Sequence, residues 1–335
     1  MKILVTGGAG FIGSCFVRMS IAETSDHIVN LDKLTYAGNL ENLSEVESQP
    51  RYQFVKGDIA DAVAVERVFE EYRPEAVVHF AAESHVDRSI HAPQQVFETN
   101  LRGTFTLLEA ARRHGIGRFV HISTDEVYGS IEAPEEADEG FPLQPSSPYS
   151  ATKAGSDLLA LSYFKTYGLP VVVTRASNNY GPYQFPEKLI PLMISNAVED
   201  QPLPVYGDGM QVRDWLYVDD HCRAIRDVLV KGREGEIYNI GGTRSLPNRE
   251  VVQRILAATG KAASLIQYVK DRPGHDRRYA LSSAKLQRET NWAPRVGFEA
   301  GLDETVKWYQ RHRGWVERVK SGEYRNFYTL NYAQR

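Results

Sequence analysis

Residues 124–126 read Thr-Asp-Glu and place two carboxylic acids side by side, directly after the apolar run RFVHIS at 118–123. Adjacent carboxylates repel each other and lose hydration where a buried strand ends, so the pair needs an explanation. In one interpretation the acids are solvated loop residues or cap a following turn. In the other, one acid donates a proton and the other accepts one, in roles set by their separate surroundings.

A second pair of residues that could take part in a reaction is Tyr149 and Lys153, which lie four residues apart in SPYSATKAGSDLL. At this spacing both side chains share one face of the helix that we expect over 149–167. A free tyrosine has a pKa of ~10, and a neighbouring ammonium favours the phenolate and lowers that value. The spacing alone is common in surface pairs, so the sequence context must decide between the two interpretations.

The elements that would position these residues alternate between strand and helix. Apolar runs predict strands at 2–6, 27–31, 52–57, 76–82, 118–123 and 170–175, and amphipathic patterns predict helices at about 11–22, 61–72, 93–114 and 149–167. Such alternation is typical of an α/β fold. We therefore predict a Rossmann-type doubly wound parallel sheet with a smaller, interleaved α/β substrate-binding lobe.

The alternation stops after Arg175, and this break suggests how the chain is divided. The segment 177–211 is rich in Asn, Pro, Tyr and Gly, with one helix expected at 187–199. A strand and helix then return at 214–218 and 219–231, followed by a strand at 236–242 and a long final helix near 299–320. We expect residues 1–176 and 212–243 to form a cofactor-binding domain, and residues 177–211 and 244–335 to form a substrate-binding domain.

The first expected turn carries a glycine pattern, with Gly7, Gly10 and Gly13 between a strand and a helix. Glycine there permits a tight turn and a close approach of the backbone to a pyrophosphate at the helix N-terminus. Asp32 ends the next strand, where a carboxylate can accept hydrogen bonds from ribose hydroxyls and would repel a 2′-phosphate. Asp58 follows the third strand and could meet the adenine. These positions predict a bound dinucleotide, NAD in preference to NADP.

Composition excludes several other classes of protein. The 335 residues carry a net charge of −4, and a negative net charge does not indicate a nucleic-acid-binding protein. No apolar stretch is long enough for a bilayer, and the first residues form a strand pattern and not a signal sequence. The two cysteines favour a reducing compartment, and Cys and His show no metal-ligand spacing. We expect a cytoplasmic protein with no membrane, nucleic-acid or metal partner.

Long matching stretches give the chain a resemblance to a known family. It resembles the extended short-chain dehydrogenases/reductases, and within them the dTDP-glucose 4,6-dehydratases. The matches include GGAGFIG, LDKLTYAGNLENL (31–43), FAAESHVDRSI (80–90), Asn100, HISTDEVYG (121–129), Tyr149-x-x-x-Lys153, SNNYGPYQFPEKLIP (177–191), DWLYVDDH (214–221), RPGHDRRYA (272–280) and KSGEYRNFY (320–328). One departure is Cys15, where the family often has asparagine; we expect it to alter packing and not chemistry.

The resemblance implies a reaction and a role for each acid and base. Water is lost across C5 and C6 of glucose after tightly bound NAD⁺ oxidises C4, and the hydride returns to C6, so the cofactor is regenerated in each turnover. Tyr149 would take the C4 hydroxyl proton, with Lys153 lowering its pKa, and Thr124 would bond the C4 oxygen. Glu126 would remove the C5 proton, and Asp125 would protonate the departing C6 hydroxyl.

The resemblance also implies two sets of binding residues. The NAD set is Gly7, Gly10, Phe11, Ile12, Gly13, Asp32, Lys33, Thr35, Asp58, Ile59, Ala81, Ala82, Ser84, Thr99, Tyr149, Lys153 and Asn179. The nucleotide-sugar set is Ser84, Thr124, Asn178, Lys188, Leu189, Pro204, Tyr206, Arg213, Asn248, Arg272 and His275. Without the resemblance, most of these residues would be interpreted as loop, capping or core positions.

Three alternatives stay open at the level of the sequence. A nucleotide-sugar C4-epimerase would use the same NAD and Tyr-Lys pair, although the acid pair argues against it. The nucleotide could be uridine and not thymidine, because the bases differ by one methyl group. The chain could also be a regulatory protein that binds NAD without turnover. The resemblance further implies a homodimer that pairs helices 93–114 and 149–167, whose exposed faces could equally pack within the domain.

Overall fold

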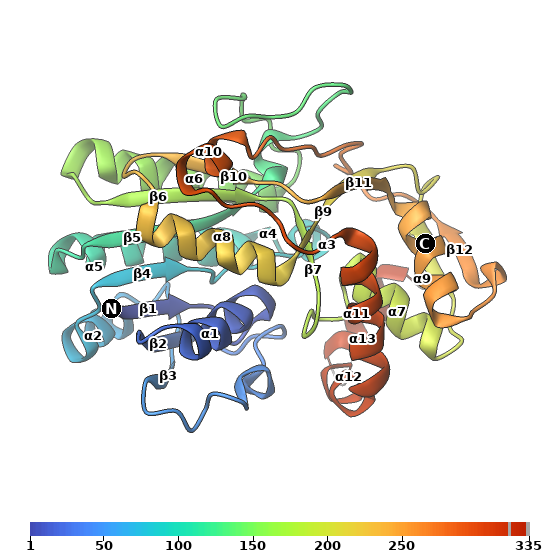
Figure 1. The fold of residues 1–335 in the computed structure, drawn as a ribbon, viewed down its shortest axis with the longest axis horizontal. Coiled ribbons are helices and arrows are strands. Elements are labelled where there is room, and N and C mark those ends of the chain that lie inside the picture. The colour runs from blue at the N-terminus through green and yellow to red at the C-terminus, as the bar shows by residue number, and fades with distance from the viewer. Residues whose placement is uncertain (321–322, 333–335) are drawn as a thin grey trace.

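The computed structural model describes residues 1–320 and 323–332, and its largest part is one sheet of seven parallel strands. The strands are β1 (Lys2–Thr6), β2 (His27–Asp32), β3 (Tyr52–Lys56), β4 (Ala76–His79), β5 (Arg118–Thr124), β6 (Val171–Ala176) and β10 (Ile237–Ile240). Their order is β10-β6-β5-β4-β1-β2-β3, which reverses direction beside β1. The prediction of a Rossmann-type parallel sheet is confirmed (Figure 1).

Helices cover both faces of this sheet, so its strands are apolar on both sides. Within β1, Ile3 and Val5 pack with α1 (Phe11–Glu23) and α8 (Val218–Lys231), in one buried cluster. Leu4 points to the other face and joins the cluster beneath the second layer of helices. That layer consists of α2 (Ala62–Tyr72), α5 (Thr104–His114) and α6 (Pro148–Tyr167). Burial on both faces explains why the strands contain almost no alternating polar residues.

Two of the predicted helices flank the site, and their observed bounds differ slightly from the predicted ones. The helix predicted over 93–114 is a continuous helical run of α4 (Pro93–Val96), the π-helical segment η2 (Phe97–Gly103) and α5. The helix predicted over 149–167 begins one residue earlier, because Ser147 and Ser150 form a capping box before it and Pro148 occupies its first turn.

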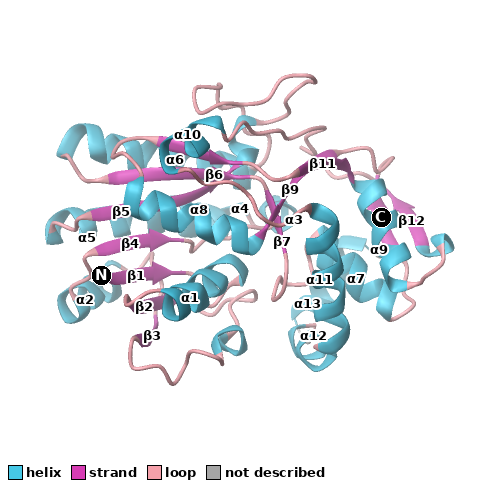
Figure 2. Cartoon of the chain, in the orientation of Figure 1, coloured by secondary structure: helices cyan, strands magenta, loops and turns pink. Residues whose placement is uncertain are grey.

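A smaller lobe stands beyond the carboxyl ends of the large sheet (Figures 1 and 2). It contains the sheet β11-β9-β7, made of β7 (Asn178–Tyr180), β9 (Val212–Tyr217) and β11 (Arg244–Pro247), and the pair β8 (Leu203–Tyr206) and β12 (Ile266–Val269). Its helices include α7 (Leu189–Val198), α9 (Asn248–Thr259) and α11 (Phe298–Arg311), which enclose a separate apolar core. β9 lies in this sheet while β10 joins the large one; the domain boundaries given above stay predictions.

Two expected elements differ from the structure. The single helix expected near 299–320 is wrong: α11 ends at Arg311, and a second helix, α12 (Arg313–Val319), follows a break at His312. The break turns Trp315 inward, where it packs on Trp308. The strand expected to reach residue 82 stops at His79, so that residues 80–82 are free to line the site.

Beyond these elements lies α13 (Glu323–Tyr332), which no pattern in the sequence predicted. Part of the matching stretch at 320–328, residues 321 and 322, lies outside the described residues. Within the described ranges no helix is long and apolar enough to span a bilayer. The same part of the chain contains no group of three or more His, Cys, Asp or Glu side chains that could hold a metal ion.

Candidate active site

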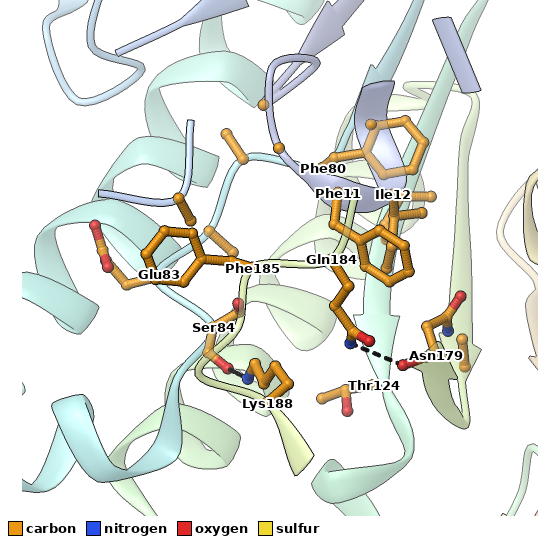
Figure 3. A pocket seen from close by; sticks show the side chains of 18 of the residues that line it. Phe11, Ile12, Phe80, Glu83, Ser84, Thr124, Asn179, Gln184, Phe185 and Lys188 are labelled. Atoms are coloured by element: carbon orange, nitrogen blue, oxygen red, sulfur yellow. Dashed lines mark hydrogen bonds between the residues drawn. The ribbon is translucent and has the colours of Figure 1, made fainter. Parts of the chain in front are cut away.

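A cavity opens at the carboxyl ends of the central strands, between the two lobes (Figure 3). All residues of the predicted NAD set line it: Gly7, Gly10, Phe11, Ile12, Gly13, Asp32, Lys33, Thr35, Asp58, Ile59, Ala81, Ala82, Ser84, Thr99, Tyr149, Lys153 and Asn179. The same cavity reaches Thr124, Asp125 and Glu126. The structure therefore brings the glycine loop, the acid pair and the Tyr-Lys pair together in one space.

The glycine loop is packed so closely that side chains are excluded from it. A Cβ on Gly13 would lie 2.2 Å from the carbonyl oxygen of Gly7, and a Cβ on Gly7 would lie 2.6 Å from the amide nitrogen of Ala81. Gly7 also has a φ of +71°, which side chains rarely adopt. Gly10 caps α1 without a side-chain hydrogen bond, so the N–H groups of the first turn remain available to an anionic ligand.

Two carboxylates mark the far end of the cavity, beyond the glycine loop. Asp32 accepts hydrogen bonds from the backbone of Ala9 at 2.9 Å and of Leu34 at 2.8 Å. Burial raises the pKa of Asp32, and these two hydrogen bonds oppose that rise. Asp58 pairs with Lys33 at 2.6 Å. Burial favours a higher pKa for Asp58, but Lys33 and a backbone hydrogen bond outweigh it and lower the value.

The acid pair occupies the short turn η3 (Asp125–Tyr128) that directly follows β5. The hydroxyl of Thr124 accepts from the amide of Glu126 at 3.3 Å and donates to Asp125 Oδ1 at 3.1 Å. The sequence analysis considered the acids themselves as a cap, and this is wrong: the residue that caps the turn is Thr124. The acids are not solvated loop residues, because Asp125 is 1% exposed and both line the cavity.

The two acids have different electrostatic surroundings. Burial raises the pKa of Asp125 well above its usual range, and the negative charges of Glu126 and Asp214 raise it further. Burial also raises the pKa of Glu126, but Arg272, Lys188 and Arg213 all oppose that rise. Asp125 is therefore the acid that favours the protonated form, while Glu126 faces three cations that favour its carboxylate.

The Tyr-Lys pair lies on α6, whose first turns border the cavity. The Lys153 ammonium donates to the carbonyl oxygen of Ile122 at 2.7 Å, and burial lowers its pKa to about 8. Burial raises the pKa of Tyr149 above its ordinary value, and the negative charge of Glu126 raises it further, while a hydrogen bond with Thr124 lowers it. The prediction that Lys153 lowers the pKa of Tyr149 is therefore wrong for the protein without bound cofactor, because the effect of burial dominates.

The predicted nucleotide-sugar residues divide into two groups. Ser84, Thr124, Asn178, Lys188 and Leu189 line the cavity. Figure 3 shows Lys188 reaching across to the carbonyl oxygen of Ser84, to which it donates a hydrogen bond. The other six predicted residues are not among those that line it: Pro204, Tyr206, Arg213, Asn248, Arg272 and His275.

Three of these six, Tyr206, Arg272 and His275, lie at or next to one buried carboxylate, Asp87, on α3 (Val86–His91). Tyr206 donates to Asp87 Oδ2 at 2.9 Å, and Arg272 Nε lies 3.7 Å from Asp87 Oδ1. The ring of His275 lies 5.9 Å from that of Tyr206. Arg213 instead donates to the carbonyl of Asp276, and Asn248 begins α9. Pro204 lies on β8.

Several cavity residues were missed by the sequence analysis. They include Phe80, Glu83, Gln184, Phe185, Glu187, Trp215 and His221. All of them except Phe185 and Phe80 carry polar groups inside quoted matching stretches, which was the available signal. His221 is an example: it is 1% exposed and bonds Asn179 Oδ1 at 2.9 Å, whereas its sequence context suggested an ordinary helix start.

Cys15, the one departure from the family pattern, lies on the buried side of α1. Its thiol donates to Asp219 at 3.3 Å and contacts Cys222 on α8. A hydrogen bond with Cys222, followed by burial, raises the pKa of Cys15 well above its usual value. A thiol in this state is a poor nucleophile, which agrees with the expectation that the change affects packing and not chemistry.

Known proteins resemble the chain over its whole length. The family model described as GDP-mannose 4,6 dehydratase matches residues 4–305. A dTDP-glucose 4,6-dehydratase of Shigella flexneri is 53% identical, with 100% of both chains covered. One of Neisseria meningitidis serogroup B is 54% identical, with 97% of both chains covered.

Solved structures agree with these relatives. The DesIV dTDP-glucose 4,6-dehydratase of Streptomyces venezuelae, with NAD and TYD bound, matches with a TM-score of 0.93 and 53% identity, covering 96% of this chain and 100% of that one. A Thermus thermophilus UDP-glucose 4-epimerase in complex with NAD matches with a TM-score of 0.87 and 36% identity, covering 93% and 100%. On its sequence, its fold and the residues that line its cavity, the chain belongs to the dTDP-glucose 4,6-dehydratase family, within the group that the GDP-mannose 4,6 dehydratase model describes.

Proposed function

We propose that the protein converts dTDP-glucose to dTDP-4-keto-6-deoxyglucose by removing water across C5 and C6. The observation that carries this proposal is the asymmetric acid pair: a buried Asp125 that favours its protonated form beside a Glu126 that faces three cations. An elimination needs one group that gives a proton and another that takes one, and this pair offers both within a single turn.

The cavity fits NAD in its shape and in its chemistry. Gly7 and Gly13 leave no space for side chains where a pyrophosphate would approach the first turn of α1. Asp32 would hold the ribose hydroxyls and Asp58 would lie toward the adenine. When bound, NAD⁺ supplies a hydride acceptor that makes C4 a ketone and afterwards returns the hydride to C6.

The side chains then perform the proton transfers. The Tyr149 phenolate, which the positive nicotinamide of bound NAD⁺ would favour, would take the proton of the C4 hydroxyl. Thr124, which bonds the tyrosine in the protein alone, would hold the C4 oxygen. With a ketone at C4, the C5 hydrogen becomes acidic, and Glu126 removes it as a proton. Glu126 would give this proton back to C5 when the hydride returns to C6. Asp125 gives its proton to the C6 hydroxyl, which leaves as water. The buried position of both acids excludes solvent that would compete for these protons.

The proposal is tested by incubating the purified protein with dTDP-glucose and without added NAD⁺. We expect a product that is lighter by one water, and a protein that already contains NAD. Asp125→Asn and Glu126→Gln should each lower kcat by about 10²–10⁴-fold, the usual contribution of a general acid or base. Absence of water loss in the wild-type protein would refute the proposal.

A C4-epimerase is the second candidate, because epimerase structures share the fold and the Tyr-Lys pair. An epimerase has no use for a protonated acid beside a carboxylate at C5 and C6. Product analysis separates the two: an epimerase yields a sugar nucleotide of unchanged mass. Comparing dTDP-glucose with UDP-glucose in the same assay tests the base, for which we expect a preference of about tenfold, the scale of one methyl contact.

We also propose a homodimer in which α5 and α6 of two copies pair. Four apolar side chains lie exposed on η2, α5 and α6: Phe97 at 49%, Phe105 at 46%, Leu158 at 58% and Tyr167 at 56%. A mass of twice 37.7 kDa by light scattering would support the proposal. Leu158→Asp should then yield monomers, whereas Val230→Asp, at a similarly exposed position on α8, should not.

We also propose a cytoplasmic location for this activity. Cys15 and Cys222 lie in contact, and we expect both to be free thiols in the protein. A reducing compartment keeps such pairs unlinked. Thiol titration of the protein purified under air-free conditions should find both thiols, and a disulfide between them would count against this location.

A further inference from the structure

Arg175 is the largest fully buried side chain of the described residues, at 2% exposed, on β6, the strand next to the edge strand β10. Burying a guanidinium is costly unless it is paired and hydrogen-bonded. Arg175 Nε donates to Asp157 Oδ2 at 2.9 Å, and its Nη1 donates to the hydroxyl of Tyr128 at 2.9 Å. The two partners belong to different elements, so one side chain connects α6 to the turn η3.

These two elements carry the two halves of the proposed chemistry. Asp157 lies on α6 one turn after Lys153, which itself follows Tyr149 by one turn. Tyr128 ends η3, two residues after Glu126. On the sheet, Arg175 lies opposite Ser123 in the β5–β6 register, next to the end of β5. Arg175 is not among the residues that line the cavity, but it directly precedes Ala176, which is one of them, and it bonds one residue of each element.

The bonds around Arg175 form a continuous buried network. The Tyr128 hydroxyl, which accepts from Arg175, donates to Asn239 Oδ1 at 2.8 Å. Asn239 in turn donates to the carbonyl of Ala137 at 3.0 Å. On the other side, Asp157 Oδ1 lies 3.3 Å from His121 Nε2, and both side chains are 0% exposed. The hydrogen bonds that run from Asp157 through Arg175, Tyr128 and Asn239 to Ala137 therefore hold α6 and η3 to one another.

We infer that Arg175, through Asp157 and Tyr128, is a positioning residue that fixes the distance between the Tyr149–Lys153 pair and the Asp125–Glu126 pair. The inference rests on the proposed function, because it assigns the two pairs to successive steps on one substrate. A substrate held by the first pair at C4 must present C5 and C6 to the second. A displacement of about 1 Å between reacting groups can cost on the order of 10²-fold in rate.

The most direct test is Tyr128→Phe, which removes one hydroxyl and leaves the ring in place. We expect kcat to fall by about tenfold, with the loss confined to the elimination step. With substrate deuterated at C5, the isotope effect on kcat should rise, while the effect for deuterium at C4 should stay or fall. Absorbance of the reduced nicotinamide should also increase in the steady state, since oxidation continues while elimination slows.

Tyr180→Phe is the matched control. Tyr180 is also 0% exposed, and its hydroxyl makes a hydrogen bond to the carbonyl of Phe298 at 3.2 Å, within the small lobe. This variant should lose stability without changing either isotope effect. A purely structural role for Tyr128 would make the two variants behave alike, and that result would overturn the inference.

A second variant, Arg175→Lys, keeps a positive charge for Asp157 but lacks the planar fork that reaches two partners. It should show the same rise in the C5 isotope effect with a larger loss of kcat. If Arg175→Lys folds and turns over with wild-type isotope effects, the inference fails even though water is still lost. Failure of the proposed function itself is distinguishable, because the wild-type protein would then form no dehydrated product.

Discussion

The two sides of the cavity are built in different ways. On the cofactor side, most of the predicted residues follow the ends of the neighbouring strands β1, β2, β3 and β4, so the large sheet places them; Thr99, the Tyr149–Lys153 pair and Asn179 come from η2, α6 and β7. On the nucleotide side, five of the predicted residues line the cavity, and the other six come from separate segments at 204–206, 213, 248 and 272–275 outside its lining. A parallel sheet fixes positions through its backbone, whereas the second group depends on contacts between side chains.

The sides also differ in charge. The cofactor side presents carboxylates, Asp32 and Asp58, each held by backbone N–H groups or by a lysine. The nucleotide side gathers the cations Lys188, Arg213 and Arg272, whose charges all reach Glu126. Ribose hydroxyls suit the first arrangement and a diphosphate suits the second. We therefore expect substitutions on the two sides to separate cofactor retention from nucleotide affinity.

The largest effect should follow from Gly13→Ala, which disrupts the close contact between α1 and the glycine loop on the cofactor side. The new Cβ would lie 2.2 Å from the oxygen of Gly7, so the glycine loop must move away from α1. We expect NAD affinity to fall on the order of 100-fold, the scale of a 1 Å displacement, with affinity for dTDP nearly unchanged. NAD content after purification and calorimetric titration with dTDP measure the two effects.

Gly297→Ala is the control for this substitution, because a Cβ at Gly297 meets nothing within 4 Å. It should leave NAD content at the wild-type level. If Gly13→Ala weakened dTDP binding as strongly as NAD binding, the two sides would not be separable in the way described here.

The next effect concerns the buried charge of Lys153. Burial lowers its pKa in the folded protein to about 8, below the usual 10.5 of the unfolded chain. Between these values the unfolded state binds a proton that the folded state does not, so stability rises with pH across the window and is lost as pH falls through 8. Over the whole window the rise should be about 3 kcal/mol, of which about 2 kcal/mol falls between pH 8 and pH 10. Urea unfolding of the wild type and Lys153→Met at pH 8 and pH 10 measures it, and parallel curves would contradict it.

The sequence was sufficient for the cofactor side because its signals are local. A strand, a glycine turn and a helix N-terminus follow one another along the chain, so Gly7, Gly10 and Gly13 needed no tertiary information. The same holds for Asp32 and Asp58 at the ends of strands, where the order of elements fixes the position. Spacing on a helix likewise placed Tyr149 and Lys153 on one face.

The rest could not be read from the sequence for physical reasons. The pKa of Tyr149 depends on how deeply the side chain is buried, and burial outweighs the helical neighbour that the spacing identified. Gln184 reaches the cavity from a loop, and His221 reaches it from the first turn of α8, whose position beside α1 depends on tertiary packing. The break at His312 follows from the need to bury Trp315, which periodicity does not reveal.

On the nucleotide side, Arg272→Met should be the converse of the glycine substitution. Its Nη1 is buried without a hydrogen-bond partner among the described residues, which leaves a donor for a ligand oxygen. Losing a charge-assisted hydrogen bond should weaken dTDP binding by about 10- to 100-fold, with NAD content unchanged. Arg277→Met is the control, since Arg277 is exposed and pairs with Asp208. Loss of NAD from Arg272→Met would show that the sides are coupled.

The smallest effect tests the contact that joins the two sides. Trp315 on α12 donates to Asn42 Oδ1 at 3.0 Å, and Asn42 donates to the carbonyl of Ala9 in the glycine loop at 3.0 Å. Trp315→Phe leaves the Asn42 oxygen unpaired in a buried place, so we expect a loss of about 1 kcal/mol in unfolding free energy and a NAD affinity reduced a few-fold. Trp292→Phe, which removes an indole N–H bonded to Asp220, should cost similar stability without affecting NAD. Equal NAD affinity in both variants would mean that the small lobe does not support the glycine loop, and that each side of the cavity binds its ligand independently.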